Sequence, residues 1–339
     1  MRRMLVLATC GLAMTLVPAS VAASAGGPVP AWQNGAGASA PGGRVSYVAV
    51  AAGRHATVVE RVRRRDGFVL DSRLVRGQLG VPGAAYDGST TGLSADGRTL
   101  VLAAFSTGFP VKRTQLVLMD AHRLRVRSRV TLAGWFTVDA ISPDGRSLFL
   151  IEYPSNGDVL HYAVRAYDVP ARRLVRRAVV DPREPDEKMQ GVPQQRVMSA
   201  DGRWAYTLYD RPTGRPFIHA LDTTGRTARC IDLPYSVQTS QSPVRMSLAD
   251  RGRQLRIRTD VQPLAPVNTR TFAVREPTTV SVSKPAPATA AATHAGTGAR
   301  WVIAIVIVAL GAGAALALAA GRRRRRRAPH DVGISVEVR

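Results

Sequence analysis

Two histidines and two aspartates are the residues of this chain whose types could support chemistry together. His161 and His219 lie near the start of β-rich segments, and with Asp139 and Asp210 they could approach a common channel. Imidazole nitrogens and carboxylate oxygens are common zinc ligands, and zinc activates water for hydrolysis. Alternatively they are isolated strand and turn residues, because nothing in the sequence fixes the distances between them.

The motifs that would identify an enzyme more directly are missing from the sequence. It contains no Gly-x-Ser-x-Gly elbow, no His-Glu-x-x-His pair, no Gly-x-x-x-x-Gly-Lys loop and no Gly-x-Gly-x-x-Gly turn. Cys10 lies in the apolar leader, so Cys230 would be the sole cysteine once that leader is removed, and it could form no intrachain disulfide. We therefore expect no catalytic residues, no cofactor and no resident metal.

Aromatic residues favour a binding role instead. Trp135, Phe136 and Tyr153 could form a platform for a sugar or a peptide, although packing inside the protein would use the same residue types. The binding site that the sequence predicts combines this platform with the neighbouring polar residues. Its six members are Trp135, Phe136, Asp139, Tyr153, His161 and Asp210.

A repeated turn organises the segments that carry these residues. Its clearest copy is Ser142-Pro143-Asp144-Gly145-Arg146, with looser copies starting at Ser94 and Ser199 and a decayed one at Ser247. An apolar strand end, an Asp-Gly turn and a second alternating strand predict a β-hairpin. The serines at positions 94, 142, 199 and 247 are 48, 57 and 48 residues apart. That period is typical of propeller blades.

A second repeated residue, an aspartate, follows the serine of the first three repeats at a nearly constant distance. Asp120, Asp168 and Asp222 each end an apolar segment, 26, 26 and 23 residues after the serine of their repeat. An arginine-rich segment follows two of them, at residues 123–130 and 172–180, as expected for an outermost strand with one face in water. The serine turn and the strand-ending aspartate recur with nearly the same spacing, and with the arginine-rich outer segment they predict blades of four strands.

The sequence resembles the bacterial Asp-Gly β-propeller repeats, a family shared by the Tol-associated (TolB-like) periplasmic propeller and the surface-layer propellers of actinobacteria and archaea. The residues that carry the resemblance are the Ser142-Pro143-Asp144-Gly145-Arg146 turn and the strand-ending Asp120, Asp168 and Asp222. It covers residues 44–276 and implies an all-β propeller that serves as a binding scaffold. Such repeats carry no fixed chemistry, so the resemblance implies no site residue.

The sequence predicts about five blades. Residues 45–51, 57–63 and 68–75 fit the last three strands of a first blade, which would suit a ring closed by the C-terminal end of the propeller. Later units begin near Tyr86, Trp135, Gln194 and Val244. A sixth blade is possible if residues 280–282 and the insertion at 181–193 contain further strands.

The N-terminal residues read as an export signal. Two arginines, an apolar run and small residues ending near Ala25 predict a signal peptide over residues 1–25. Lipidation at Cys10 is a weaker alternative, because Thr9 fits a lipoprotein signal poorly. Residues 26–43 are rich in Gly, Ala and Pro and predict a flexible lead-in.

The C-terminal residues predict a membrane anchor. Residues 277–299 have the composition of an extended stalk, and residues 301–320 form an uncharged run long enough to cross a bilayer as a helix. The tail, residues 321–339, begins with a stop-transfer cluster that the positive-inside rule places in the cytoplasm. The cluster is Arg322, Arg323, Arg324, Arg325, Arg326 and Arg327. A wall-sorting signal is the alternative, but its Leu-Pro-x-Thr-Gly motif is missing.

The chain carries a formal net charge of +23, almost all of it from arginine. A GC-rich genome would produce this bias, and so would selection for a polyanionic partner. We predict no nucleic-acid binding, since the arginine cluster follows a membrane span. The expected protein is a single-pass membrane protein with an extracytoplasmic propeller that binds a protein or an anionic cell-envelope polymer. A propeller-type lactonase or glycosidase with an acidic or metal site at the channel mouth is the alternative.

Overall fold

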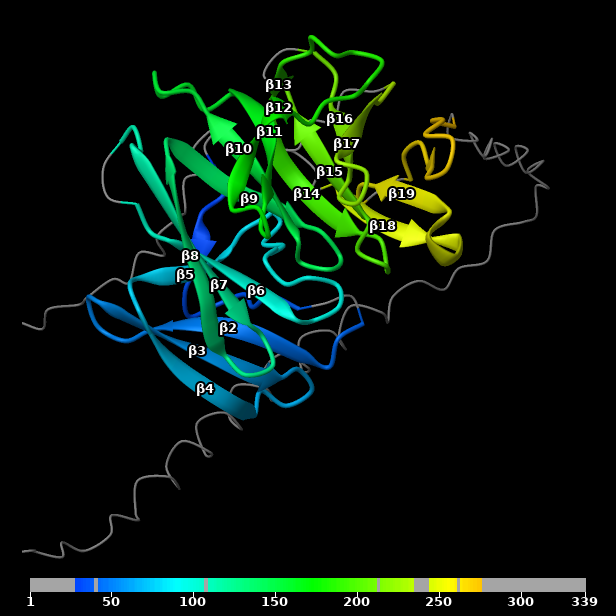
Figure 1. Ribbon diagram of the computed structural model, residues 1–339. Helices are drawn as coiled ribbons and strands as arrows, with labels where there is room; N and C mark the ends of the chain where they lie inside the picture. The colour runs from blue at the N-terminus through cyan, green and yellow to red at the C-terminus, as the bar shows by residue number, and fades with distance from the viewer. Residues whose placement is uncertain are drawn as a thin grey trace, which may run out of the picture. The chain divides into compact units, whose positions relative to one another are not determined.

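The computed structural model describes residues 28–39, 42–106, 109–211, 214–234, 244–260 and 263–275. They form an all-β structure (Figure 1), as predicted, with one short 3-10 turn at Asp250–Gly252. No helix in these ranges is long and apolar enough to cross a membrane. The predicted signal peptide, stalk, transmembrane helix and arginine-rich tail lie outside the described residues.

The strands form five antiparallel sheets that follow one another along the described chain. The first contains β2 (Val45–Ala51), β3 (Ala56–Arg63) and β4 (Val69–Arg76). The second contains β1 (Ala31–Trp32), β5 (Leu79–Pro82), β6 (Thr99–Ala104), β7 (Arg113–Asp120) and β8 (Arg125–Ala133). The third contains β9 (Trp135–Ile141), β10 (Ser147–Tyr153), β11 (His161–Asp168), β12 (Arg173–Ala178) and β13 (Met189–Gln190). The fourth contains β14 (Val192–Met198), β15 (Trp204–Asp210), β16 (Phe217–Asp222) and β17 (Thr227–Asp232), and the fifth β18 (Arg245–Ala249), β19 (Gln254–Arg258) and β20 (Val267–Asn268).

Neighbouring sheets pack face to face through apolar side chains. The alternation of a strand sends successive residues to opposite faces, so Leu148 and Leu150 pack against the second sheet while Phe149 and Ile151 pack against the fourth. Similar clusters join the first sheet to the second and the fourth to the fifth. Successive antiparallel meanders stacked in this way are the organisation of a β-propeller.

The chain start departs from the predicted flexible lead-in. β1 pairs with β5, and Ala38 is buried and bridges to Tyr47 of β2. Asn34 also hydrogen bonds to β2, donating its backbone amide to the carbonyl of Ala49 at 2.8 Å. Residues 34–38, rather than the C-terminal end of the propeller, therefore lie along the inner edge of the first sheet. The Gly- and Pro-rich composition hid this role because a short edge segment needs few apolar residues.

Two further boundaries differ from the sequence prediction. The second sheet begins at β5, before Tyr86, where the sequence predicted its start. After β5 the chain forms a loop that extends to the fourth sheet, where the Tyr86 amide donates to the Pro193 carbonyl at 3.0 Å. The insertion at 181–193 does contain an extra strand, β13. It pairs with β11 and so belongs to the third sheet, and it forms no additional blade.

The repeated Ser-x-Asp-Gly turn has one hydrogen-bonding pattern in its three intact copies. In the copy between β9 and β10, the Ser142 hydroxyl donates to Asp144 at 2.7 Å and accepts from the Ser147 amide at 2.9 Å. The Asp144 carboxylate in turn accepts from the Arg146 amide. Equivalent bonds start from Ser94 and Ser199. The decayed copy forms the 3-10 turn instead.

The glycine of this turn allows a test of how the sheets pack. Gly97 and Gly145 have φ values of 70° and 71°, so alanine at either position incurs the same backbone strain, about 1 kcal/mol. A Cβ on Gly97 would contact nothing within 4 Å, whereas one on Gly145 would lie 2.7 Å from Cβ of Thr99 in the second sheet. We expect Gly145→Ala to lower the free energy of unfolding by about 2 kcal/mol more than Gly97→Ala, measured by urea unfolding. Equal losses would contradict the packing of this turn on the second sheet.

Candidate functional site

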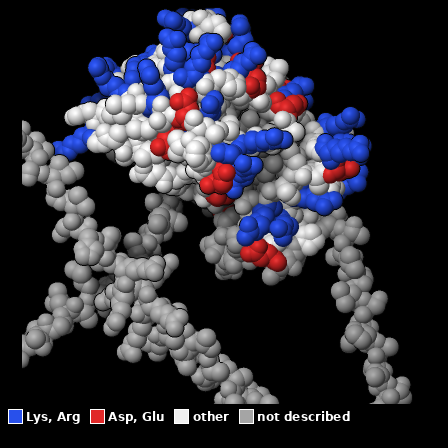
Figure 2. All heavy atoms as spheres, turned by 90° about the horizontal axis from the view of Figure 1, so that it is seen from below, with Lys and Arg blue, Asp and Glu red and all other residues white. Residues whose placement is uncertain are grey.

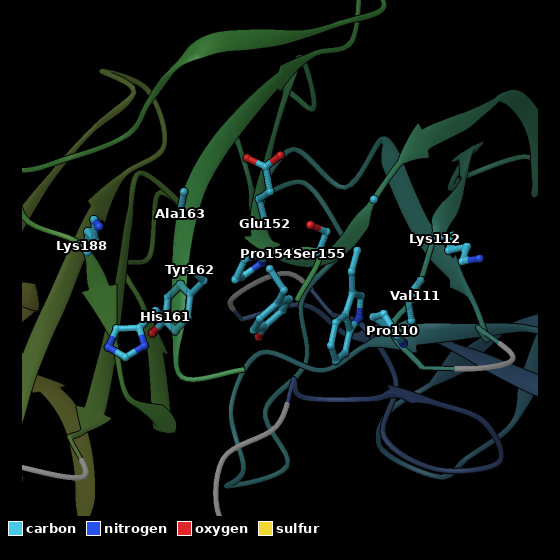
Figure 3. Close-up of a pocket in the computed structure, with 13 residues that line it drawn as sticks. Pro110, Val111, Lys112, Glu152, Pro154, Ser155, His161, Tyr162, Ala163 and Lys188 are labelled. Carbon is cyan, nitrogen blue, oxygen red and sulfur yellow. The ribbon is translucent and has the colours of Figure 1, made fainter. Parts of the chain in front are cut away.

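A pocket of about 850 Å³ lies on the third sheet (Figure 3). It lies where β9 starts, β10 ends and β11 starts, and its lining includes Trp135, Tyr153, His161 and Tyr162. Three of the six predicted site residues, Trp135, Tyr153 and His161, therefore meet in one place. Antiparallel pairing brings them together, because Trp135 and Tyr153 are direct cross-strand partners.

Aromatic rings form a continuous row from this pocket into the interface with the fourth sheet. Ring centroids lie 4.9 Å apart for Trp135 and Tyr153, 5.7 Å for Tyr153 and Tyr162, and 6.0 Å for Tyr162 and Tyr209. Burial raises the pKa of Tyr153 and Tyr162 above the usual range of a phenol, so both remain neutral. The inner end of the row is buried in the core. At the outer end, Trp135 is half-buried and the exposed Phe109 packs edge-on against it with ring centroids 5.3 Å apart, so both rings can meet a ligand.

The charged residues around the pocket differ in what they contact. The carboxylate of Glu152 forms an ion pair with the guanidinium of Arg165, with an N–O distance of 2.6 Å. Nδ1 of His161 lies 2.8 Å from a carboxylate oxygen of Asp158. Lys112 and Lys188 form no ion pair with another described residue, and Figure 3 shows them on opposite sides of the pocket. With Glu152 compensated, the pocket presents an apolar aromatic wall and two exposed positive charges.

Phe136 and Asp139 do not join the predicted platform. Phe136 follows Trp135 directly in β9, so its side chain points to the other face of the sheet, where it packs between the second and third sheets. Asp139 is 1% exposed and lies in the interior. The alternation along β9 was the signal that separates Phe136 from Trp135, and Tyr162 takes the position that we expected for Phe136.

Asp139 is one half of a buried ion pair. The guanidinium of Arg196 in β14 donates to the Asp139 carbonyl at 2.8 Å and also to its carboxylate. The Arg196 amide donates to the carboxylate of Asp87, in the loop of the second sheet, at 3.3 Å. These bonds join the inner strands of the third and fourth sheets to that loop. A buried charge requires such a partner, so the role of Asp139 is structural.

A polar row continues from this pair across the fourth sheet. Arg196, Thr207, His219 and Cys230 are successive cross-strand partners on β14, β15, β16 and β17, and so lie on one face. His219 is 1% exposed, and neither ring nitrogen has a hydrogen-bond partner among the described residues. Burial lowers the pKa of His219 to about 4, which makes its imidazole neutral. Arg196 gave no signal in the sequence, because its partners lie 57 and 109 residues away.

The metal site that the sequence left open as a possibility is not assembled among the described residues. Among the described residues, one group of three His, Cys, Asp or Glu side chains lies close enough to share a metal ion, and it consists of Glu184, Glu187 and Cys230. It includes none of the four residues that the sequence suggested. Asp139 is engaged by Arg196, His161 lies beside Asp158, and Asp210 ends β15 opposite Val192. The acidic or metal site of a propeller-type hydrolase therefore gains no support from these residues.

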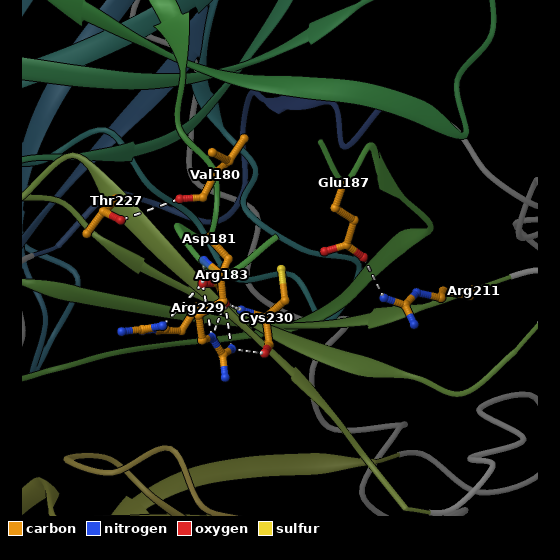
Figure 4. A network of polar contacts seen from close by, with 8 residues as sticks. All are labelled: Val180, Asp181, Arg183, Glu187, Arg211, Thr227, Arg229 and Cys230. Carbon is orange, nitrogen blue, oxygen red and sulfur yellow. Dashed lines mark hydrogen bonds and ion pairs between the residues drawn. The ribbon is translucent and has the colours of Figure 1, made fainter. Parts of the chain in front are cut away.

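The insertion at residues 181–195 is fixed by a buried carboxylate (Figure 4). The side chain of Asp181 is fully buried and forms ion pairs with Arg183 at 2.6 Å and Arg229 at 3.2 Å. The backbone amide of Cys230 donates to it at 3.0 Å. Farther along the insertion, Glu187 accepts from Arg211 at 3.2 Å. These contacts attach the insertion to the fourth sheet and place Lys188 beside the aromatic pocket.

No protein family model and no curated protein matches the chain. Among solved structures it is similar to TolB from Acinetobacter baumannii, with a TM-score of 0.40 and 16% identity over 71% of this chain and 52% of TolB. The β-propeller domain of the Trilobed protease from Pyrococcus furiosus gives 0.38 and 7% identity over 73% of this chain and 71% of that domain. Hydrazine synthase from Kuenenia stuttgartiensis gives 0.41 and 15% identity over 76% and 67%. The chain spans about half the length of TolB, and no activity is transferred from these proteins.

The Asp181 network predicts a pH-dependent contribution to stability. Burial raises the pKa of Asp181, but hydrogen bonds from Arg183 and the Cys230 amide outweigh it and hold the pKa at about 2, below the usual 3.8. Because the pKa of Asp181 is lower in the folded state than in the unfolded state, its ionised carboxylate stabilises the fold at pH values above 3.8. This stabilisation is lost as the pH falls from 3.8 through about 2. At neutral pH the contribution is about 2 kcal/mol.

We therefore expect Asp181→Asn to lower the free energy of unfolding by about 2 kcal/mol near neutral pH, and by little in strong acid. The matched control is Asp186→Asn, in the same insertion, because Asp186 is exposed and forms no hydrogen bond or ion pair with another described residue. Urea unfolding of both variants as a function of pH measures the difference. A loss at Asp181 that does not change with pH would show that its charge is not the cause.

Proposed function

We propose that this chain is a membrane-anchored, extracytoplasmic β-propeller that acts as a binding scaffold for a protein or a cell-envelope polymer. The propeller fold of the described residues supports a scaffold, and the sequence patterns at both ends support export and anchoring. In this proposal the propeller has five blades, and residues 301–320 cross the membrane with the arginine cluster in the cytoplasm.

The observation that carries the proposed binding role is the aromatic pocket on the third sheet. Its volume, about 850 Å³, lies in the range of ligand sites, and its wall combines the exposed part of Trp135 with the buried rings behind it. Flat aromatic faces suit the C–H face of a sugar ring or an apolar peptide side chain. Lys112 and Lys188 favour a ligand that also carries negative charge, such as an acidic glycan strand of the envelope.

This proposal predicts that Trp135 dominates the affinity. In a pull-down of the full-length, detergent-solubilised chain against envelope fractions, Trp135→Leu should reduce binding at least about tenfold, because aromatic anchors at the centre of a contact contribute most of its energy. Trp204→Leu is the matched control, since Trp204 stacks on Tyr206 and lies outside the pocket. Binding that survives high salt would support aromatic recognition. Equal retention by both variants would contradict a role for the pocket.

The proposed topology is tested on intact cells. A protease added outside should cleave the propeller from its anchor, while an epitope fused after Arg339 stays protected until the cells are lysed. The control is a cytoplasmic protein of the same cells, which must remain intact. A protected propeller, or an accessible C-terminal epitope, would overturn the assignment of compartments.

A further inference from the structure

A second hollow lies between the first and second sheets, away from the aromatic pocket. Its volume is about 540 Å³. The turns at the ends of β3 and β4 supply Arg54, His55 and Arg76, and the outer strand β8 supplies Arg129. We call this hollow the basic cleft. None of the described residues that line it is acidic.

The backbone of the basic cleft is held rigidly. The Thr57 side chain is fully buried, and its hydroxyl donates to the Gly77 carbonyl at 2.8 Å and accepts from the Leu79 amide at 2.9 Å. The Gly77 amide donates to the His55 carbonyl at 2.7 Å. These bonds fix both turns that carry Arg54, His55 and Arg76. The cleft is therefore formed before any ligand arrives.

The charges of the basic cleft are not compensated from within the protein. The guanidinium groups of Arg54 and Arg76 take part in no hydrogen bond or ion pair with another described residue. The guanidinium of Arg129 donates to the backbone carbonyl of Arg76 at 2.9 Å, which holds it at the cleft without neutralising its charge. On the same outer strand, by contrast, Arg127 is paired with Asp120 at 2.6 Å. Three like charges around one hollow repel one another, and a bound anion would relieve that repulsion.

The remaining lining of the basic cleft fits a ligand larger than a free anion. Gln78, Gln115 and Thr131 offer neutral donors and acceptors suited to hydroxyl groups. Gln115 and Thr131 are cross-strand partners on the face that also carries Arg129. A site of this volume holds a ligand of several carbon atoms.

We propose that the basic cleft binds a phosphate group carried on a sugar or polyol. The arginine fork matches the oxygens of a phosphate, and the neutral polar groups meet the hydroxyls beside it. This site is separate from the aromatic pocket, so either can fail without the other. The arginines of the basic cleft are exposed, like the Lys and Arg clusters on the face shown in Figure 2, and the feature that sets the cleft apart is a lining without carboxylates among the described residues.

The test uses glycerol 3-phosphate and neutral glycerol as probes, titrated by calorimetry into the full-length chain in detergent. The unmodified chain should bind the phosphate and not glycerol. Arg54→Gln and Arg76→Gln should each weaken binding about tenfold, because each removes one charge-assisted contact with the ligand and no side-chain hydrogen bond or ion pair to another described residue. Arg177→Gln is the matched control, because Arg177 on β12 is exposed and has no ion pair with another described residue, and it should change the affinity less than about twofold.

Three outcomes would overturn the proposal. The first is no heat of binding with glycerol 3-phosphate, and the second is equal weakening by Arg177→Gln, which would show a diffuse charge effect. The third is unchanged affinity in both cleft variants. Thermal unfolding of each variant, expected to match the unmodified chain, separates a lost contact from a lost fold. Trp135→Leu, tested with the same probe, should bind normally, so that a failure of the aromatic pocket does not mimic a failure of the basic cleft.

Discussion

The burial of both faces of each inner sheet is the constraint on which this structure depends. A single meander of four strands cannot cover its own apolar faces, so Leu148 and Phe149, neighbours in β10, require a sheet on either side. The stacking of sheets that buries these side chains also sets the positions of the aromatic pocket and the basic cleft. The aromatic pocket opens at the edge of the third sheet, where the row of rings emerges from its interface with the fourth, and the basic cleft opens between the first two sheets.

Inside this apolar stack, the ion pair between Asp139 and Arg196 determines how the inner strands align. Apolar contacts tolerate small displacements, whereas a buried carboxylate without its partner carries a desolvation cost of several kcal/mol. The pair therefore favours one alignment of β9 with β14. The contact of Arg196 with Asp87 extends the same alignment to the second sheet. Three sheets are thus tied by polar groups at their inner edges and by apolar groups across their faces.

Most of the fold was readable from the sequence because its signals are local. Hairpin turns such as Ser142 to Ser147 are closed by hydrogen bonds within a few residues, and the predicted strands of the first sheet match β2, β3 and β4 within about one residue. The inner-edge segment at residues 34–38 was missed because its place is set by its hydrogen bonds to β2, and its own composition gives no strand pattern. The site was half predictable: the cross-strand pairing of Trp135 with Tyr153 follows from a hairpin, but the partner of Asp139 is 57 residues away and left no pattern.

The position of residues 28–39 on β2 and β5 has a consequence for how the chain is made. Synthesis proceeds from the N-terminus, so this segment leaves the ribosome before the strands that it pairs with. Each of those strands therefore has an edge partner that precedes it in the chain, and the pairing covers backbone groups that would otherwise be open to another chain.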